Sequence, residues 1–143
     1  MIAVDTNVLV HAHRTGSEAS AAARARLRAL AEGSAPWAIP VFCLGEFLRV
    51  MTHRRYFSNP HSVAEARRAV EDLVASPSVM VLRPGERFTS LLLDAVVEGR
   101  AHGNRVFDAQ IVALCREWSV ARLLTYDRDF ARWRGMKVET PGD

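Results

Sequence analysis

The chain has 143 residues, of which 49% are hydrophobic and 24% are charged. This balance is typical of a globular protein with one core, so we expect a single domain over residues 1–143. No apolar run approaches the ~20 residues of a membrane helix, and the amino end lacks the basic and long apolar segments of a signal peptide. We therefore expect a cytoplasmic protein with no membrane partner. The net charge of +3 allows a polyanionic partner without requiring one.

Short apolar runs alternate with helical patterns along the whole chain. Strands are predicted at 2–4, 37–39, 79–82 and 122–125, with a short fifth at 136–139. Helices are predicted between them, at 6–13, 17–33, 41–53, 62–74, 86–101 and 106–118. This alternation predicts an α/β fold, a parallel sheet with helices on both faces. The carboxyl ends of parallel strands then lie along one edge.

Local signals support several of these elements. Ser17 is expected to cap the second helix, and Ser62 with Glu65 has the spacing of a capping box. Pro40 suits the first turn of the helix at 41–53. That helix is apolar almost all round, so we expect it to be largely buried. The two cysteines, Cys43 and Cys115, lie in apolar stretches and are expected to be buried, reduced thiols.

Four acidic residues lie at or near the predicted edge of the sheet. Asp5 follows the first strand directly, and Asp127 follows the fourth by two residues. Asp108 opens the helix at 106–118, and Glu46 is the only acid between 41 and 51. Together these positions favour one acidic site where open α/β sheets bind their ligands.

Each acid also has an ordinary explanation. Asp5 is a common helix cap, and the helix dipole favours Asp108 in a first turn. Asp127 and Asp129 suit a turn, and Glu46 is compatible with simple exposure to water. The sequence pattern alone leaves these alternatives open.

The residue types restrict the chemistry of such a site. Close carboxylates repel unless a cation lies among them, and oxygen ligands favour Mg²⁺ or Mn²⁺. Zinc spacing is absent, as are a Gly-x-Ser-x-Gly elbow and a Walker-type phosphate loop. Mg²⁺ held by carboxylates is well suited to phosphoryl transfer, since it acidifies a bound water and neutralises phosphate oxygens.

Four segments in order resemble the motifs of PIN domains. They are 5–9, 46–47, 108–114 and 123–130. The length and the segment 46–50 look most like VapC-type toxins of bacterial toxin–antitoxin pairs. The resemblance implies a PIN-like three-layer α/β/α sandwich with a central parallel sheet of four to five short strands. It also implies a Mg²⁺- or Mn²⁺-dependent endoribonuclease that cuts a structured RNA, tRNA or rRNA. Further implications are a homodimer and a small VapB-type antitoxin.

The resemblance also assigns roles to residues. Its acids carry over to Asp5, Glu46, Asp108 and Asp127, with Asp129 as a fifth. We expect Asp5 and Asp108 to make the closest approach to the metal, and cleavage to leave a 5′-phosphate and a 3′-hydroxyl.

Supporting roles are expected around these acids. Thr6, Asn7 and Thr125 are candidates for orienting carboxylates or waters, the alternative for the threonines being plain turn hydroxyls. The candidates for RNA backbone contacts are Arg14, Arg54, Arg55 and Arg105. Free histidine titrates near neutral pH, which makes His11 and His13 candidates for acid–base catalysis, although a helix-end role is favoured.

Two other functions stay open. A haloacid-dehalogenase-like phosphohydrolase also begins with a strand and an Asp, but it needs a second acid where this chain has Asn7, and its lysine could only be Lys137. A PIN-fold module that binds RNA or protein without cutting usually lacks one or more acids, whereas all four positions are filled here.

Overall fold

A computed structural model describes all of residues 1–143, and its centre is a five-stranded sheet. The strands are β1 (Ile2–Val4), β2 (Trp37–Pro40), β3 (Val79–Leu82), β4 (Arg122–Leu124) and β5 (Lys137–Glu139). Their order is β3-β2-β1-β4-β5, and every neighbouring pair is parallel. The predicted parallel sheet is therefore confirmed, including its short fifth strand.

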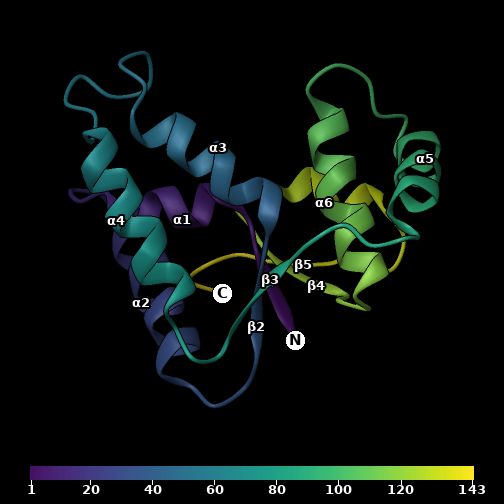
Figure 1. The fold of residues 1–143 in the computed structure, drawn as a ribbon, viewed down its shortest axis with the longest axis horizontal. Coiled ribbons are helices and arrows are strands. Elements are labelled where there is room, and N and C mark those ends of the chain that lie inside the picture. The colour runs from purple at the N-terminus through teal and green to yellow at the C-terminus, as the bar shows by residue number, and fades with distance from the viewer.

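Helices cover both faces of this sheet. They are α1 (Thr6–His13), α2 (Glu18–Glu32), α3 (Val41–Met51), α4 (Val63–Val74), α5 (Phe88–Glu98), α6 (Arg105–Glu117) and the 3₁₀ turn η1 (Arg128–Arg132). Figure 1 shows α1 to α4 on one side of the strands and α5 and α6 on the other. Right-handed crossovers account for this division, because the chain moves one way from β1 to β3 and the opposite way from β3 to β4.

Local signals set the helix starts. The Ser17 hydroxyl accepts a hydrogen bond from the Ser20 amide (3.0 Å) and so caps α2. Both bonds of the capping box between Ser62 and Glu65 are present at the start of α4. These two predictions are confirmed.

The end of α5 differs from the prediction. The helix ends at Glu98 rather than near residue 101, because Arg100 adopts a left-handed conformation (φ 49°). Gly99 is required just before it, since a Cβ there would lie 2.5 Å from the Trp133 indole.

The prediction that the helix at 41–53 is largely buried is wrong. In α3 only one stripe is buried, formed by Cys43, Phe47 and Met51. Leu48 is 37% exposed, and Glu46 is exposed as well. The reason is that α3 packs against α1 and α4, while several of its other residues line the cavities described below.

The core lies between the sheet and its two helical layers. The residues of β1 and β2 are buried, as are Leu123 and Leu124 of β4. Cys43 and Cys115 are buried, free thiols, as predicted. None of the helices combines the length and apolarity that crossing a membrane demands.

Candidate active site

The site lies at the point where the direction of the sheet connections reverses. β1 and β4 are neighbours, but the chain leaves β1 towards β2 and leaves β4 towards β5. Such a reversal opens a crevice at the carboxyl ends of the two strands, where α/β sheets bind ligands. Asp5 follows β1 here, and Thr125 with Asp127 follows β4.

All four predicted acids line one cavity of about 270 Å³ at this crevice. The lining acids are Asp5, Glu46, Asp108 and Asp127. They come from the end of β1, the second turn of α3, the first turn of α6 and the segment after β4. Segments far apart in the chain are thus brought to one concave surface.

Asp5 is the most deeply placed of these acids, with 6% of its surface exposed. Its Oδ1 accepts a hydrogen bond from the Thr6 amide (2.7 Å), which also caps α1. Its Oδ2 accepts from the Thr125 hydroxyl (2.6 Å) and from the Asn7 side-chain amide (3.0 Å). Burial raises the pKa of Asp5 from 3.8 to about 6, and repulsion from Glu46 and Asp108 adds to this rise. The carboxyl group is therefore held firmly in an environment that disfavours its charge.

The neighbouring polar side chains bind the acids together. The Thr6 hydroxyl donates to Glu46 Oε2 (3.0 Å). Asn7 also donates to the Thr125 hydroxyl (3.1 Å) and accepts from the Tyr126 amide (3.1 Å). Thr125 Oγ1 accepts from the Asp127 amide (3.0 Å). Thr6, Asn7 and Thr125 thus form a network that links the ends of β1 and β4.

Arg105 lies within the acidic cluster. Its Nη1 donates to Asp108 (3.0 Å) and to Asp127 (3.4 Å), and its Nη2 donates to Asp129 (2.8 Å). The pKa of Asp108 is raised overall. Burial is the largest cause, the Arg105 guanidinium opposes it, and the Asp127 charge adds to the rise. Arg105 therefore already neutralises part of the acidic charge.

No three of these carboxylates converge closely enough to form a ready-made metal cage. The contacts explain why: Thr6 holds Glu46, and Arg105 holds Asp108 and Asp127. The donor set nevertheless suits a hard divalent cation, since all its atoms are carboxylate oxygens. A cation beside Asp5 would also offset the burial and repulsion that raise its pKa.

The other predicted charged residues have varied surroundings. Asp129 does not line the acidic cavity, and its side chain is 58% exposed. Arg14 lies over the Phe57 ring (3.9 Å to its centre) and so helps to hold the loop after α3. Arg54 and Arg55, in that same loop, are exposed and form no ion pair.

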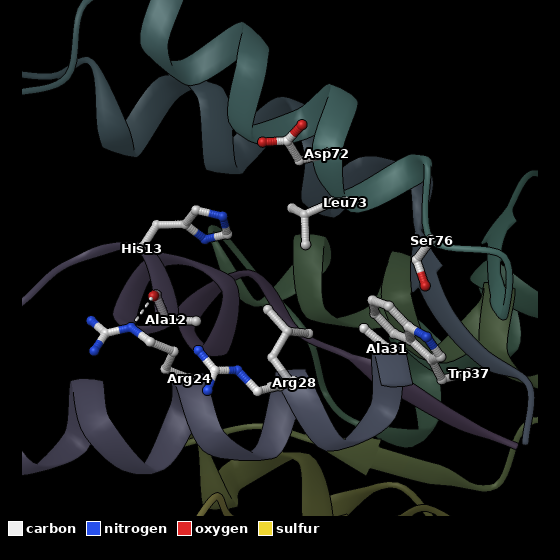
Figure 2. Close-up of a pocket in the computed structure, with 10 residues that line it drawn as sticks. Ala12, His13, Arg24, Arg28, Ala31, Trp37, Asp72, Leu73 and Ser76 are labelled. Atoms are coloured by element: carbon white, nitrogen blue, oxygen red, sulfur yellow. Dashed lines mark hydrogen bonds between the residues drawn. The ribbon is translucent and has the colours of Figure 1, made fainter. Parts of the chain in front are cut away.

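The two histidines of α1 differ in position. His11 lines the acidic cavity, and its ring meets the edge of Tyr126 at 4.9 Å. Figure 2 shows His13 in a separate cavity of about 220 Å³, between α1, α2 and α4, which none of the four acids lines. Its Nδ1 lies 2.8 Å from the Leu9 carbonyl oxygen, and burial lowers its pKa. His13 thus fits the helix-end role.

The structure adds residues that the sequence pattern did not reveal. Arg49, Tyr56, Asn104 and Phe107 line a wider cavity of about 570 Å³ beside Glu46, Arg105 and Asp108. The only sequence signal for Phe107 was its position directly before Asp108. Arg49 belongs to the segment 46–50 that resembles VapC-type toxins, but the resemblance assigned it no role. The places of these residues beside the acids depend on tertiary packing, which no local pattern specifies.

Comparison with known proteins identifies the family. The family model described as PIN domain matches residues 2–135. Ribonuclease VapC43 of Mycobacterium tuberculosis is 40% identical over 143 residues, which cover 100% of this chain and 97% of that protein. Ribonuclease VapC31 of the same species is 33% identical over 141 residues, covering 99% of each chain.

Solved structures agree at the level of the fold. The crystal structure of VapBC2 from Rickettsia felis, bound to a DNA fragment from their promoter, gives a TM-score of 0.69 at 18% identity, with 98% of each chain covered. VapC20 of Mycobacterium tuberculosis, described as a sarcin–ricin loop cleaving toxin, gives 0.66 at 20% identity, with 92% and 93% covered. The family match confirms the resemblance found in the motifs: the chain belongs to the PIN-domain family, among the VapC ribonucleases.

Proposed function

We propose that this chain is a Mg²⁺- or Mn²⁺-dependent endoribonuclease and the toxin of a toxin–antitoxin pair. The observation that carries the proposal is the convergence of four carboxylates, from four separate segments, on one cavity at the sheet reversal. The curated relatives of the whole chain are named as ribonucleases, which supports the same activity.

The acids hold the divalent ion in this proposal, Asp5 and Asp108 most closely and Glu46 and Asp127 around them. Bound there, the ion supplies an acidified water and positive charge for the phosphate oxygens. Asp129 is a less direct contributor, because it lies outside the cavity on the far side of Arg105.

The protein's own groups prepare the site before the ion or RNA arrives. Three hydrogen bonds orient Asp5, so its carboxylate needs little rearrangement to bind a cation. Thr6 holds Glu46 at the rim in the same way. In-line attack by water would form a new P–O bond and break the bond from phosphorus to the ribose 3′-oxygen. The 3′-oxygen would take up a proton and leave as a hydroxyl, and the phosphate would stay on the 5′ end of the other fragment.

The RNA reaches the acids along the exposed loop after α3. Arg54 and Arg55 are its backbone contacts, and in the chain they directly precede Tyr56, which lines the cavity next to the acids. Arg14 and Arg105 contribute less, since Phe57 and the acidic cluster already engage them. A structured tRNA or rRNA is the proposed substrate, and the description of VapC20 supports this class.

The proposed partners are a small VapB-type antitoxin and a second copy of the chain. The neighbour from Rickettsia felis was solved as a VapBC complex, which supports the first. Residues 1–143 act as one PIN-like domain, and the reduced thiols suit the cytoplasm.

Incubating purified protein with total RNA and Mg²⁺ or Mn²⁺, followed by mapping of new 5′ ends, tests the activity. We expect cleavage at a small number of sites, loss of cleavage in excess EDTA, and loss in Asp5→Asn. Asp94→Asn is the matched control, because Asp94 is an exposed carboxylate on α5 that lines none of the site cavities. Cleavage by Asp5→Asn at the wild-type rate would contradict the assignment, and absence of any cleavage would favour the silent binding module.

A further inference from the structure

An apolar cavity of about 260 Å³ adjoins the acidic site, between α3 and α6. Its lining includes Phe42, Gly45, Arg49, Phe107 and Gln110. It shares Glu46 with the acidic cavity. Asp108, which follows Phe107 in the chain, lines the acidic cavity. The apolar cavity and the acidic cavity are therefore neighbours that meet at Glu46.

Phe107 gives this cavity an open aromatic face. Its side chain is 60% exposed although it stands in the first turn of α6. Phe42, by contrast, is half-buried and packs against the Phe88 ring, with 5.7 Å between the ring centres. One ring is therefore anchored in the protein, and the other has no aromatic neighbour of its own.

Gly45 keeps one wall of the cavity open. Glycine destabilises a helix interior relative to alanine, yet Gly45 lies within α3. Its backbone does not adopt the left-handed conformation, and a Cβ at this position would meet no atom within 4 Å. Neither the backbone nor packing within the chain requires glycine here. The absence of a side chain at Gly45 instead leaves space within the cavity that Phe107 also lines.

We propose that this cavity binds one unpaired nucleobase of the RNA substrate, stacked on Phe107, with the adjoining phosphate at the acids. The proposal rests on the proposed ribonuclease function. Proteins that read RNA loops commonly stack splayed bases on aromatic side chains and bond their edges with polar groups. Gln110 offers both amide donors and an acceptor for a base edge.

The charges around the cavity favour a nucleotide over an apolar protein segment. The Arg49 side chain is 54% exposed, and its contacts are long: 3.9 Å to Glu46 and 3.4 Å to the Tyr56 hydroxyl. Its guanidinium is therefore available to a phosphate. The neighbouring acids, which begin at Glu46, suit a phosphate only together with a cation. A nucleotide next to the cleaved bond presents both an apolar base and a charged phosphate, which match these two surroundings.

A cycle of protein and RNA changes tests the inference. The probe is a short RNA carrying the mapped cleavage site, with single abasic substitutions at each position in turn. We expect one abasic position to lower kcat/KM of the wild type roughly tenfold or more, and Phe107→Ala to cause a loss of the same size. The two changes together should lower kcat/KM little more than either change alone. Phe107→Trp should retain activity.

Gly45 provides a second, independent variant. Gly45→Leu should fill the cavity and lower kcat/KM as Phe107→Ala does, although leucine is a better helix former than glycine. Leu93→Ala is the control for removing an exposed apolar side chain, because Leu93 lies on α5 and is 61% exposed. Mn²⁺ affinity should be unchanged in all of these variants.

Several results would overturn the inference. Additive losses in the cycle, or equal losses at every abasic position, would show that Phe107 holds no particular base. A change of oligomeric state on sedimentation of Phe107→Ala would assign the cavity to a second copy of the chain. Weakened antitoxin binding with unchanged cleavage would assign it to the antitoxin. If the wild type cuts no RNA, the ribonuclease proposal fails as well, whereas cleavage with an additive cycle removes only the nucleobase site.

Discussion

Replacing Asp5 with asparagine is expected to stabilise the metal-free protein at neutral pH. Burial is the main reason that the pKa of Asp5 rises from 3.8 to about 6, so the folded state disfavours the charged carboxylate. The raised pKa of Asp5 contributes to the free energy of unfolding. This contribution is fully present below about pH 4 and is lost as the pH rises through about 6. An uncharged side chain of nearly the same shape would not incur this loss.

The magnitude follows from the shift. About two pKa units correspond to about 3 kcal/mol. Asparagine accepts fewer hydrogen bonds than the carboxylate, which receives three, and losing one costs about 1 kcal/mol. We therefore expect a net gain of about 1–2 kcal/mol at pH 7.5, or roughly 3–8 °C in Tm.

Urea and thermal unfolding in EDTA, followed by circular dichroism at pH 7.5 and pH 4, measures this difference. At pH 4 the gain should vanish or reverse, because the wild-type carboxyl is then neutral in the folded state. Asp94→Asn should show no comparable dependence on pH. A variant that is less stable than the wild type at both pH values would refute the reasoning, as would an equal gain at both.

Three further outcomes are expected. Asp108→Asn should lower the rate of cleavage roughly 100-fold or more, with an unchanged far-UV spectrum. Even residues that only orient a metal ligand contribute about 10–100-fold to activity. Cleavage at the wild-type rate would remove Asp108 from the site. Arg105→Gln should bind Mn²⁺ roughly 3- to 10-fold more tightly by calorimetry, because the Arg105 guanidinium no longer competes for Asp108 and Asp127. Without metal the variant should be less stable, since these ion pairs are lost. Weaker Mn²⁺ binding would contradict this expectation. Thr6→Val should weaken Mn²⁺ binding roughly tenfold, because Glu46 loses its donor, whereas the exposed control Thr89→Val should not.

Much of the local structure follows from the sequence. The capping box of Ser62 and Glu65 starts α4 as expected, because its two bonds need only residues three apart. The strands follow from short apolar runs, and their alternation with helices predicts the parallel sheet. The order of the acids along the chain likewise sufficed to find the PIN motifs, since those motifs are local.

Other features depend on neighbours distant in the chain. The composition of α3 predicts a buried helix, but its exposure is set by how α1 and α4 pack against one side of it. Arg105 looked like a surface cation available to RNA. Three carboxylates, two of them from the segment after β4, hold it inside the cluster instead.

The sequence by itself thus determined the strands and most helix boundaries, because short-range hydrogen bonding and periodicity govern these. Its motifs also named the four acids as candidates. Only the tertiary structure decided that Asp5 is buried, that Arg105 neutralises its neighbours and that Phe107 faces an open cavity. Burial and charge pairing arise between side chains that the parallel sheet brings together across most of the chain, and no local pattern specifies that proximity.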